Sequence, residues 1–134
     1  MYFVSEKIVI INILEQITFM AKTSLGLEEN IEGALCYVLG WITGIVFYLL
    51  EKENKFVRFH AVQSILTFFP LWILSIIFGG WSWLLLWHVW FFLVWISWII
   101  WIIMFILWLV LMIKAYQGEK YKLPIVGDMA EKYA

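Results

Sequence analysis

Four polar side chains stand at the helical spacing i, i+3, i+4 and i+7 inside an otherwise apolar run: His60, Gln63, Ser64 and Thr67. A helix would place them on one face, which we call the polar stripe. Imidazole, amide and hydroxyl groups are costly against lipid, so the stripe should face protein or water. One interpretation is a polar cleft that receives a substrate or a partner's helix. The other is hydrogen bonding between helices of this chain, with repair of the backbone near Pro70.

Arg58 lies just before the polar stripe and extends the candidate partner-binding set. Its long side chain predicts an anchor that reaches the membrane surface, or a partner for Glu51, in preference to a binding group. Pro70 should bend its helix and free one carbonyl about a turn earlier. Ser64 and Thr67 are well placed to donate hydrogen bonds there.

Catalytic and metal chemistry are not expected. Asp128, the single aspartate, lies in the C-terminal tail, and no general base is arranged around Ser64. His60 and His88 fall on opposite membrane faces in the predicted topology, and Cys36 is the single cysteine. The sequence therefore predicts no enzyme, no cofactor and no metal site.

A second pattern gathers small side chains on one face of residues 31–50. Its members are Gly33, Gly40, Thr43 and Gly44, and Gly40 and Gly44 form a small-xxx-small pair. Such a face lets two helix backbones approach closely in lipid. Packing against another helix of this chain and a homodimer seam are both open.

These residues must be positioned by membrane helices. Of the 134 residues, 65% are hydrophobic and 14% are charged, against roughly half and a quarter in soluble domains. The composition excludes a soluble or disordered chain. A formal net charge of -1 lacks the basic excess that nucleic-acid binding requires. The lipid bilayer is the first expected partner.

The apolar runs make residues 23–134 a single all-α, polytopic membrane domain. Three of them are about one hydrocarbon thickness long as helices, which predicts three transmembrane helices: 31–50, 59–78 and 91–113. The tryptophan-rich segment 79–90 is typical of an interfacial aromatic belt. Residues 81–113 would also fit one tilted helix, unbroken near Trp90. A tail follows at 114–134.

The N-terminal residues 1–22 carry apolar side chains at helical spacing, which predicts an amphipathic helix in the membrane interface. A start at Met20 would remove it. Lysine and arginine gather in 51–58 and in 114–134 and are absent between the second and third spans. With three spans, both basic segments of this multi-pass cell-membrane protein are cytoplasmic and the N-terminus is outside.

Three segments carry a family resemblance: 24–30, 51–64 and 114–119. They closely resemble a prokaryotic family of small, uncharacterised multi-pass membrane proteins, most specifically in residues 57–61 and 63–64. The resemblance covers about residues 22–132, and that family is itself distantly similar to the Tic-type chloroplast inner-envelope protein-import subunit. It implies a membrane protein and leaves the activity open.

We therefore predict a non-enzymatic binding or scaffold subunit that uses the polar stripe to bind another membrane protein or a translocating segment. The alternative is a subunit of an oligomeric channel or small-solute transporter, assembled through Gly40 and Gly44. The first predicts a membrane-protein partner, and the second predicts a homo-oligomer.

Overall fold

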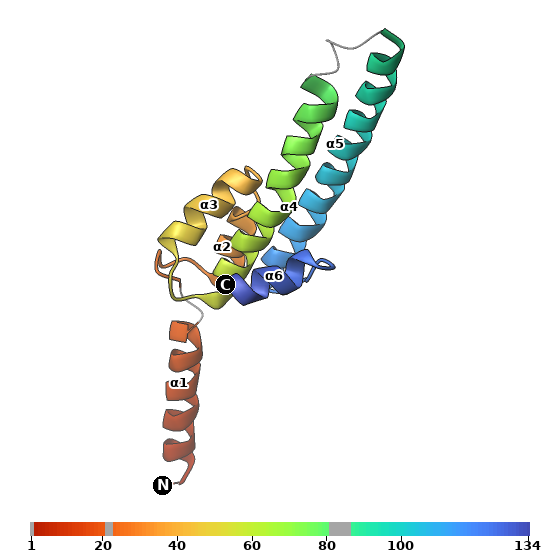
Figure 1. Ribbon diagram of the computed structural model, residues 1–134. Helices are drawn as coiled ribbons and strands as arrows, with labels where there is room; N and C mark the ends of the chain where they lie inside the picture. Colours follow the sequence, from red (N-terminus) through yellow and green to blue (C-terminus); the bar gives the residue numbers. More distant parts are fainter. Residues whose placement is uncertain (1, 21–22, 81–86) are drawn as a thin grey trace.

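The structure is a computed structural model that describes residues 2–20, 23–80 and 87–134. Every regular element in those ranges is a helix, so the all-α prediction is confirmed. The helices are α1 (Tyr2–Met20), α2 (Glu29–Leu35), α3 (Trp41–Leu50), α4 (Lys55–Gly80), α5 (Trp87–Tyr116) and α6 (Val126–Tyr133). Figure 1 shows α4 and α5 as a long antiparallel pair, with α2, α3 and α6 gathered around one end of it.

The long pair supplies the segments able to cross a membrane. α4 has 26 residues and α5 has 30, which is roughly 39 and 45 Å of helix, and both are apolar enough to span. They contain the predicted spans 59–78 and 91–113. Because α5 begins at Trp87 and continues unbroken through Trp90, the end of the proposed belt 79–90 belongs to the spanning helix. Residues 81–86 of that belt lie outside the described ranges.

The prediction of a third span at 31–50 is wrong. α2 ends at Leu35, α3 begins at Trp41, and the turn between them reverses the chain. The reversal depends on Gly40, whose φ of 62° and ψ of -131° strongly disfavour any residue with a Cβ. The apolar run is therefore a helical hairpin, and the described chain has two candidate spans instead of three.

Both arms of this hairpin end on the same side of the molecule. Glu51, after α3, accepts hydrogen bonds from the N–H (2.6 Å) and the hydroxyl (2.8 Å) of Ser24, which precedes α2. The Asn54 side-chain amide donates to Glu29 at 3.1 Å. The hairpin thus enters and leaves at one end of the α4–α5 pair. We call this end, where residues 23–30, 51–58 and 114–134 lie, the polar end.

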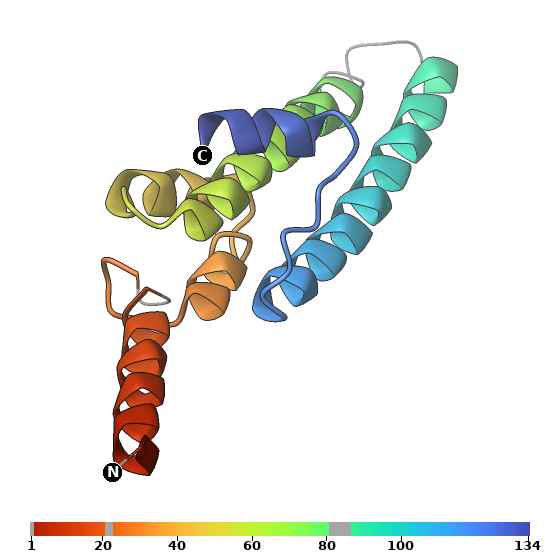
Figure 2. The ribbon, with the colours of Figure 1, turned by 90° about the horizontal axis from the view of Figure 1, so that it is seen from below.

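The chain after α5 folds back onto the polar end. Gly118, with a φ of 76°, and Glu119 form a Schellman turn, in which their N–H groups donate to the carbonyls of Ala115 (2.9 Å) and Lys114 (3.0 Å). An extended stretch then leads to α6, which packs on α4 (Figure 2). Ala130 of α6 is fully buried in that contact.

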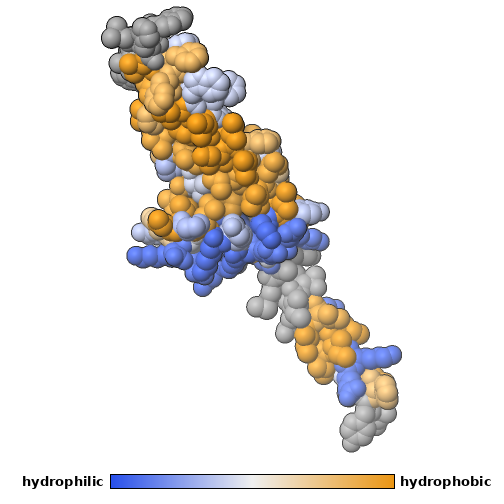
Figure 3. Space-filling model, turned by 90° about the vertical axis from the view of Figure 1, so that its right-hand side faces the viewer, coloured by the Kyte–Doolittle hydropathy of each residue, from blue (hydrophilic) through white to orange (hydrophobic). Residues whose placement is uncertain are grey.

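The surface hydropathy follows this arrangement. Figure 3 shows an apolar column bounded by a hydrophilic band at the polar end. Exposed side chains of the hairpin are themselves apolar, among them Ile31, Val38, Leu39, Ile42, Val46 and Leu49. So much exposed apolar surface is typical of a segment that is covered by lipid or by another protein. Side chains 3–15 of α1 are exposed, and its place in the interface stays a prediction.

Candidate functional site

The polar stripe is buried near the polar end of α4, where the chain's own groups cover it. His60, Gln63 and Ser64 are fully buried, and Thr67 nearly so. The Nδ1 atom of His60 lies 3.0 Å from the hydroxyl of Tyr37, in the turn of the hairpin. The imidazole therefore faces the hairpin, where its hydrogen bond offsets the cost of burial.

Gln63 binds the tail. Its amide nitrogen donates to the carbonyl of Tyr121 at 2.9 Å, and its amide oxygen accepts the N–H of Leu123 at 3.5 Å. Together these bonds pair one side-chain amide with an extended backbone, much as a neighbouring β-strand would. Segment 121–123 thus occupies the place that the cleft interpretation assigned to a partner.

Ser64 and Thr67 are not used as expected near Pro70. The Ser64 hydroxyl donates to the carbonyl of Gly40 at 2.8 Å, in the turn of the hairpin. The Thr67 hydroxyl is buried without a hydrogen-bond partner among the described residues. α4 nevertheless continues as one helix through Pro70. The hydroxyl of Ser64 therefore serves the contact between α4 and the hairpin.

Arg58 connects the end of α3 to the start of α4. Its guanidinium donates to the backbone carbonyl of Glu51 at 3.1 Å and stands 4.4 Å from the ring centre of Tyr48. The hydrogen bond and the cation–π contact hold it against its own chain. It meets Glu51 through the main chain, while the carboxylate of Glu51 binds other groups.

Glu51 connects the segments that meet at the polar end, a role that was not predicted from the sequence. Its carboxylate is buried and accepts hydrogen bonds from the N–H groups of Ser24, Glu53 and Asn54 and from the Ser24 hydroxyl. Burial raises the pKa of a carboxyl group, but these donors outweigh it, so the pKa of Glu51 lies below its ordinary value of 4.5. A glutamate ending a long apolar run is the signal that could have revealed it.

The small-residue face of the hairpin meets α4 of the same chain. A Cβ on Gly44 would lie 2.9 Å from the carbonyl oxygen of Ala61. One on Gly33 would lie 2.8 Å from the ring of Phe56. Because α4 covers this face, an oligomeric channel would need a different surface for its assembly.

The turn of the hairpin, residues 36–40, is irregular backbone in the middle of an apolar run. Trp108 of α5 donates its Nε1–H to the carbonyl of Tyr37 at 2.6 Å, and the Thr43 hydroxyl donates to that of Cys36 at 3.0 Å. In a membrane, irregular backbone is tolerated only where protein covers it. These donors and Ser64 satisfy the carbonyls of the turn, as a re-entrant segment requires. The sequence did not single out Trp108 for this role.

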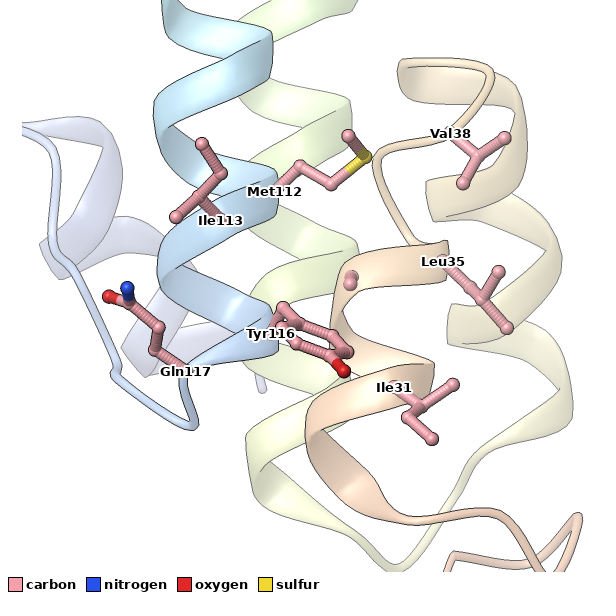
Figure 4. Close-up of a pocket in the computed structure, with 8 residues that line it drawn as sticks. Ile31, Leu35, Val38, Met112, Ile113, Tyr116 and Gln117 are labelled. Carbon is pink, nitrogen blue, oxygen red and sulfur yellow. The ribbon is translucent and has the colours of Figure 1, made fainter.

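An apolar groove lies between α2 and α5 at the surface of the molecule (Figure 4). Its volume is about 390 Å³, and its lining is Ile31, Ala34, Leu35, Val38, Met112, Ile113, Tyr116 and Gln117. Tyr116, the last residue of α5, and Gln117, which follows it, are its polar residues, but the Gln117 side chain points away from α2 (Figure 4). Since the lining is almost entirely apolar, the groove suits an apolar ligand.

The fold describes an all-helical protein with two helices long and apolar enough to span a membrane and a short helical hairpin packed against them. This architecture agrees with the similarity of the sequence to known proteins. The chain belongs to the magnetosome magnetite crystal formation protein family, whose sequence pattern matches residues 28–130.

Relatives of the chain are also membrane proteins. A UPF0132 membrane protein of Methanocaldococcus jannaschii is 58% identical over 120 residues, which are 87% of this chain and 97% of the relative. A second one from that organism is 44% identical, covering 82% of this chain and 73% of its own length. One from Archaeoglobus fulgidus is 46% identical, covering 79% and 95%.

These matches confirm the resemblance to a prokaryotic membrane protein family and the membrane location. They give no support to the resemblance to the Tic-type import subunit. No solved structure matches the chain.

Proposed function

We propose that this protein is a non-enzymatic membrane subunit that binds an apolar helix in the groove between α2 and α5. The helix belongs to another membrane protein or to a segment entering the membrane. The groove is the observation that carries this proposal, since it is apolar, faces the bilayer and has exposed lining such as Ile113. We propose the groove in place of the polar stripe, because Gln63 and Ser64 of the stripe bind the tail and the hairpin.

Two lining residues favour a helix as the occupant. Ala34 is small, so a second helix can approach the backbone of α2 closely. Met112 carries a flexible thioether that adapts to partners of different shape. At the end of the groove, the exposed Tyr116 carries a hydroxyl that can pair with a polar residue at the end of the bound helix.

The re-entrant hairpin also changes the proposed orientation. Residues 23–30 lie at the polar end together with the basic segments 51–58 and 114–134. The lysine and arginine bias places this end in the cytoplasm. The start of the hairpin is then cytoplasmic, whereas three spans had placed the N-terminal segment outside.

Site-specific photocrosslinking in the native membrane tests the groove. A photoreactive residue at Ile113 should capture a discrete membrane protein. The matched control is Ile102, which is the same residue type, 55% exposed against 51%, and lies on the same face of α5. It stands six residues, about 9 Å of helix, beyond Trp108, which contacts the turn of the hairpin.

Capture of a discrete protein from Ile113 but not from Ile102 supports the proposal. Equal labelling from both positions, or capture of lipid alone at Ile113, contradicts it.

A further inference from the structure

The described helices are distributed unequally along the α4–α5 pair. α4 and α5 run the length of the pair, whereas α2 and α3 are present only toward the polar end (Figure 1). α2 has 7 residues and α3 has 10, which is about 10 and 15 Å of helix. Each leaflet contributes about 15 Å to the hydrocarbon core. The hairpin is therefore about one leaflet deep.

Contacts to both spanning helices fix the depth of the turn. A Cβ on Gly40 would lie 3.7 Å from the Cβ of Phe68 on α4. Phe68 is nine residues beyond Phe59, where the apolar part of α4 starts, and nine residues make about 14 Å of helix. Trp108 of α5 reaches the carbonyl of Tyr37 in the same turn. The turn thus lies near the bilayer midplane.

Beyond the turn, only α4 and α5 remain among the described helices. One polar contact between them there is the hydrogen bond from the Ser97 hydroxyl to the carbonyl of Ser75, at 3.4 Å. Large apolar side chains such as Trp98 are 64% exposed. Alongside the other half of the pair, Leu39 and Leu49 are similarly exposed but belong to the hairpin, Leu39 to its turn and Leu49 to α3. Lipid surrounds a wider protein in one leaflet than in the other.

From this asymmetry we infer that the protein acts as a wedge, which prefers membrane curved so that the polar-end leaflet is convex and which promotes such curvature at high density. A helix with a diameter of 10–12 Å has a cross-section of roughly 80–110 Å², so the hairpin adds roughly 160–220 Å² to one leaflet. Convex curvature spreads the headgroup side of a leaflet, and inserted helices fill the space that opens.

A wedge acts only if its wide part is stiff, and the hairpin is braced at both ends. At the turn, Ser64 of α4 holds the carbonyl of Gly40 at 2.8 Å. At the polar end, the carboxylate of Glu51 joins the start of the hairpin to its end through Ser24. Along α3, Gly44 packs directly on α4. Lateral pressure from lipid would therefore meet four packed helices.

Membrane tubes pulled from giant vesicles measure the curvature preference. The full-length chain, labelled with a fluorophore, is reconstituted in phosphatidylcholine with a minority of phosphatidylglycerol. Protease treatment of a C-terminal tag separates molecules whose polar end faces outward from those facing inward. Outward molecules should be enriched about two-fold or more on narrow tubes relative to flat membrane, and inward molecules should be depleted.

A matched variant distinguishes the effect of the hairpin on sorting from that of α1, because an interfacial amphipathic helix also senses curvature. Ile10→Asp with Ile13→Asp places charges on exposed apolar positions of α1 and leaves the hairpin intact. The wedge is supported if this variant is still enriched on tubes when its polar end faces outward and still depleted there when its polar end faces inward. Loss of sorting in this variant assigns the preference to α1 and overturns the inference. Equal density on tube and flat membrane, or the same sign in both orientations, overturns it as well.

Discussion

The contacts that stabilise the α4–α5 pair differ between its two halves. Near the polar end, buried side chains form short hydrogen bonds between elements, such as Ser64 to Gly40 at 2.8 Å and Gln63 to Tyr121 at 2.9 Å. In the far half, the Ser97 hydroxyl reaches α4 at 3.4 Å. The polar half depends on directional contacts, whereas the far half depends on being apolar and long enough to span. Matched substitutions should therefore cost more near the polar end.

The largest effect is expected at Glu51. Glu51→Gln leaves one acceptor oxygen where a carboxylate accepted several hydrogen bonds, and it turns an N–H₂ group toward other donors. We expect a loss of about 2–3 kcal/mol in the free energy of unfolding. Unfolding in mixed micelles, followed by tryptophan fluorescence, measures it. The exposed Glu53 beside it is the control, and Glu53→Gln should be nearly neutral. Equal losses would contradict the role of Glu51.

Acid should weaken the polar end through the same carboxylate. The pKa of Glu51 in the folded protein lies below its ordinary value of 4.5. Its stabilising contribution is therefore present above pH 4.5 and is lost as the pH falls toward the folded pKa. The unfolding midpoint of the wild type should drop more steeply below pH 4.5 than that of Glu51→Gln. Parallel curves for the two proteins would show that other groups carry the acid sensitivity.

Alanine substitutions at two glycines, one in each half, compare the two halves directly. A Cβ on Gly44 would lie 2.9 Å from the carbonyl oxygen of Ala61, which belongs to the backbone and cannot turn away. A Cβ on Gly79 would lie 3.0 Å from the hydroxyl oxygen of Ser97, which can rotate. Gly44→Ala should cost about 1–3 kcal/mol in the unfolding assay, and Gly79→Ala much less. A larger loss at Gly79 would reverse the proposed comparison.

Gln63→Leu should release the tail without unfolding the bundle. The substitution leaves the carbonyl of Tyr121 and the N–H of Leu123 without their side-chain partner, at a local cost of about 1–2 kcal/mol. Hydrogen exchange at Leu123 and trypsin cleavage after Lys122 should both become faster. Gln117→Leu, at an exposed position, is the control. Unchanged exchange in Gln63→Leu would mean that α6 alone holds the tail.

The two long helices could be predicted from the sequence because each contains an uninterrupted apolar run long enough to cross a membrane. Residues 59–78 and 91–113 are apolar for a full hydrocarbon thickness, and α4 and α5 contain them both. The structure extends the two helices toward their ends, at Lys55 and Trp87, where charge and tryptophan content obscured the boundary. Helical periodicity likewise grouped His60 with Gln63 and Ser64, which are all buried.

The hairpin could not be predicted because a hydropathy pattern gives the length of an apolar run but does not show whether the chain reverses within it. Residues 31–50 contain no polar turn, since Trp108 and Ser64 from other helices satisfy the carbonyls at the reversal. Gly40 marks the turn, but a glycine is also common within membrane helices. The tail contact of Gln63 was equally hidden, because it joins residues almost sixty positions apart. Long-range pairings of this kind leave no periodic pattern.

The smallest difference in the free energy of unfolding is expected between alanine substitutions of two serines, one in each half. Ser64→Ala removes the 2.8 Å bond to the carbonyl of Gly40, yet the hydroxyl of Thr43 still lies 3.2 Å from that oxygen. The loss should be about 0.6 kcal/mol, the average for hydrogen bonds between membrane helices. Ser97→Ala removes a bond of 3.4 Å and should cost less, near the resolution of the same unfolding assay. If Ser97→Ala were the more destabilising, polar contacts would govern the far half as well, and the contrast between the two halves would fail.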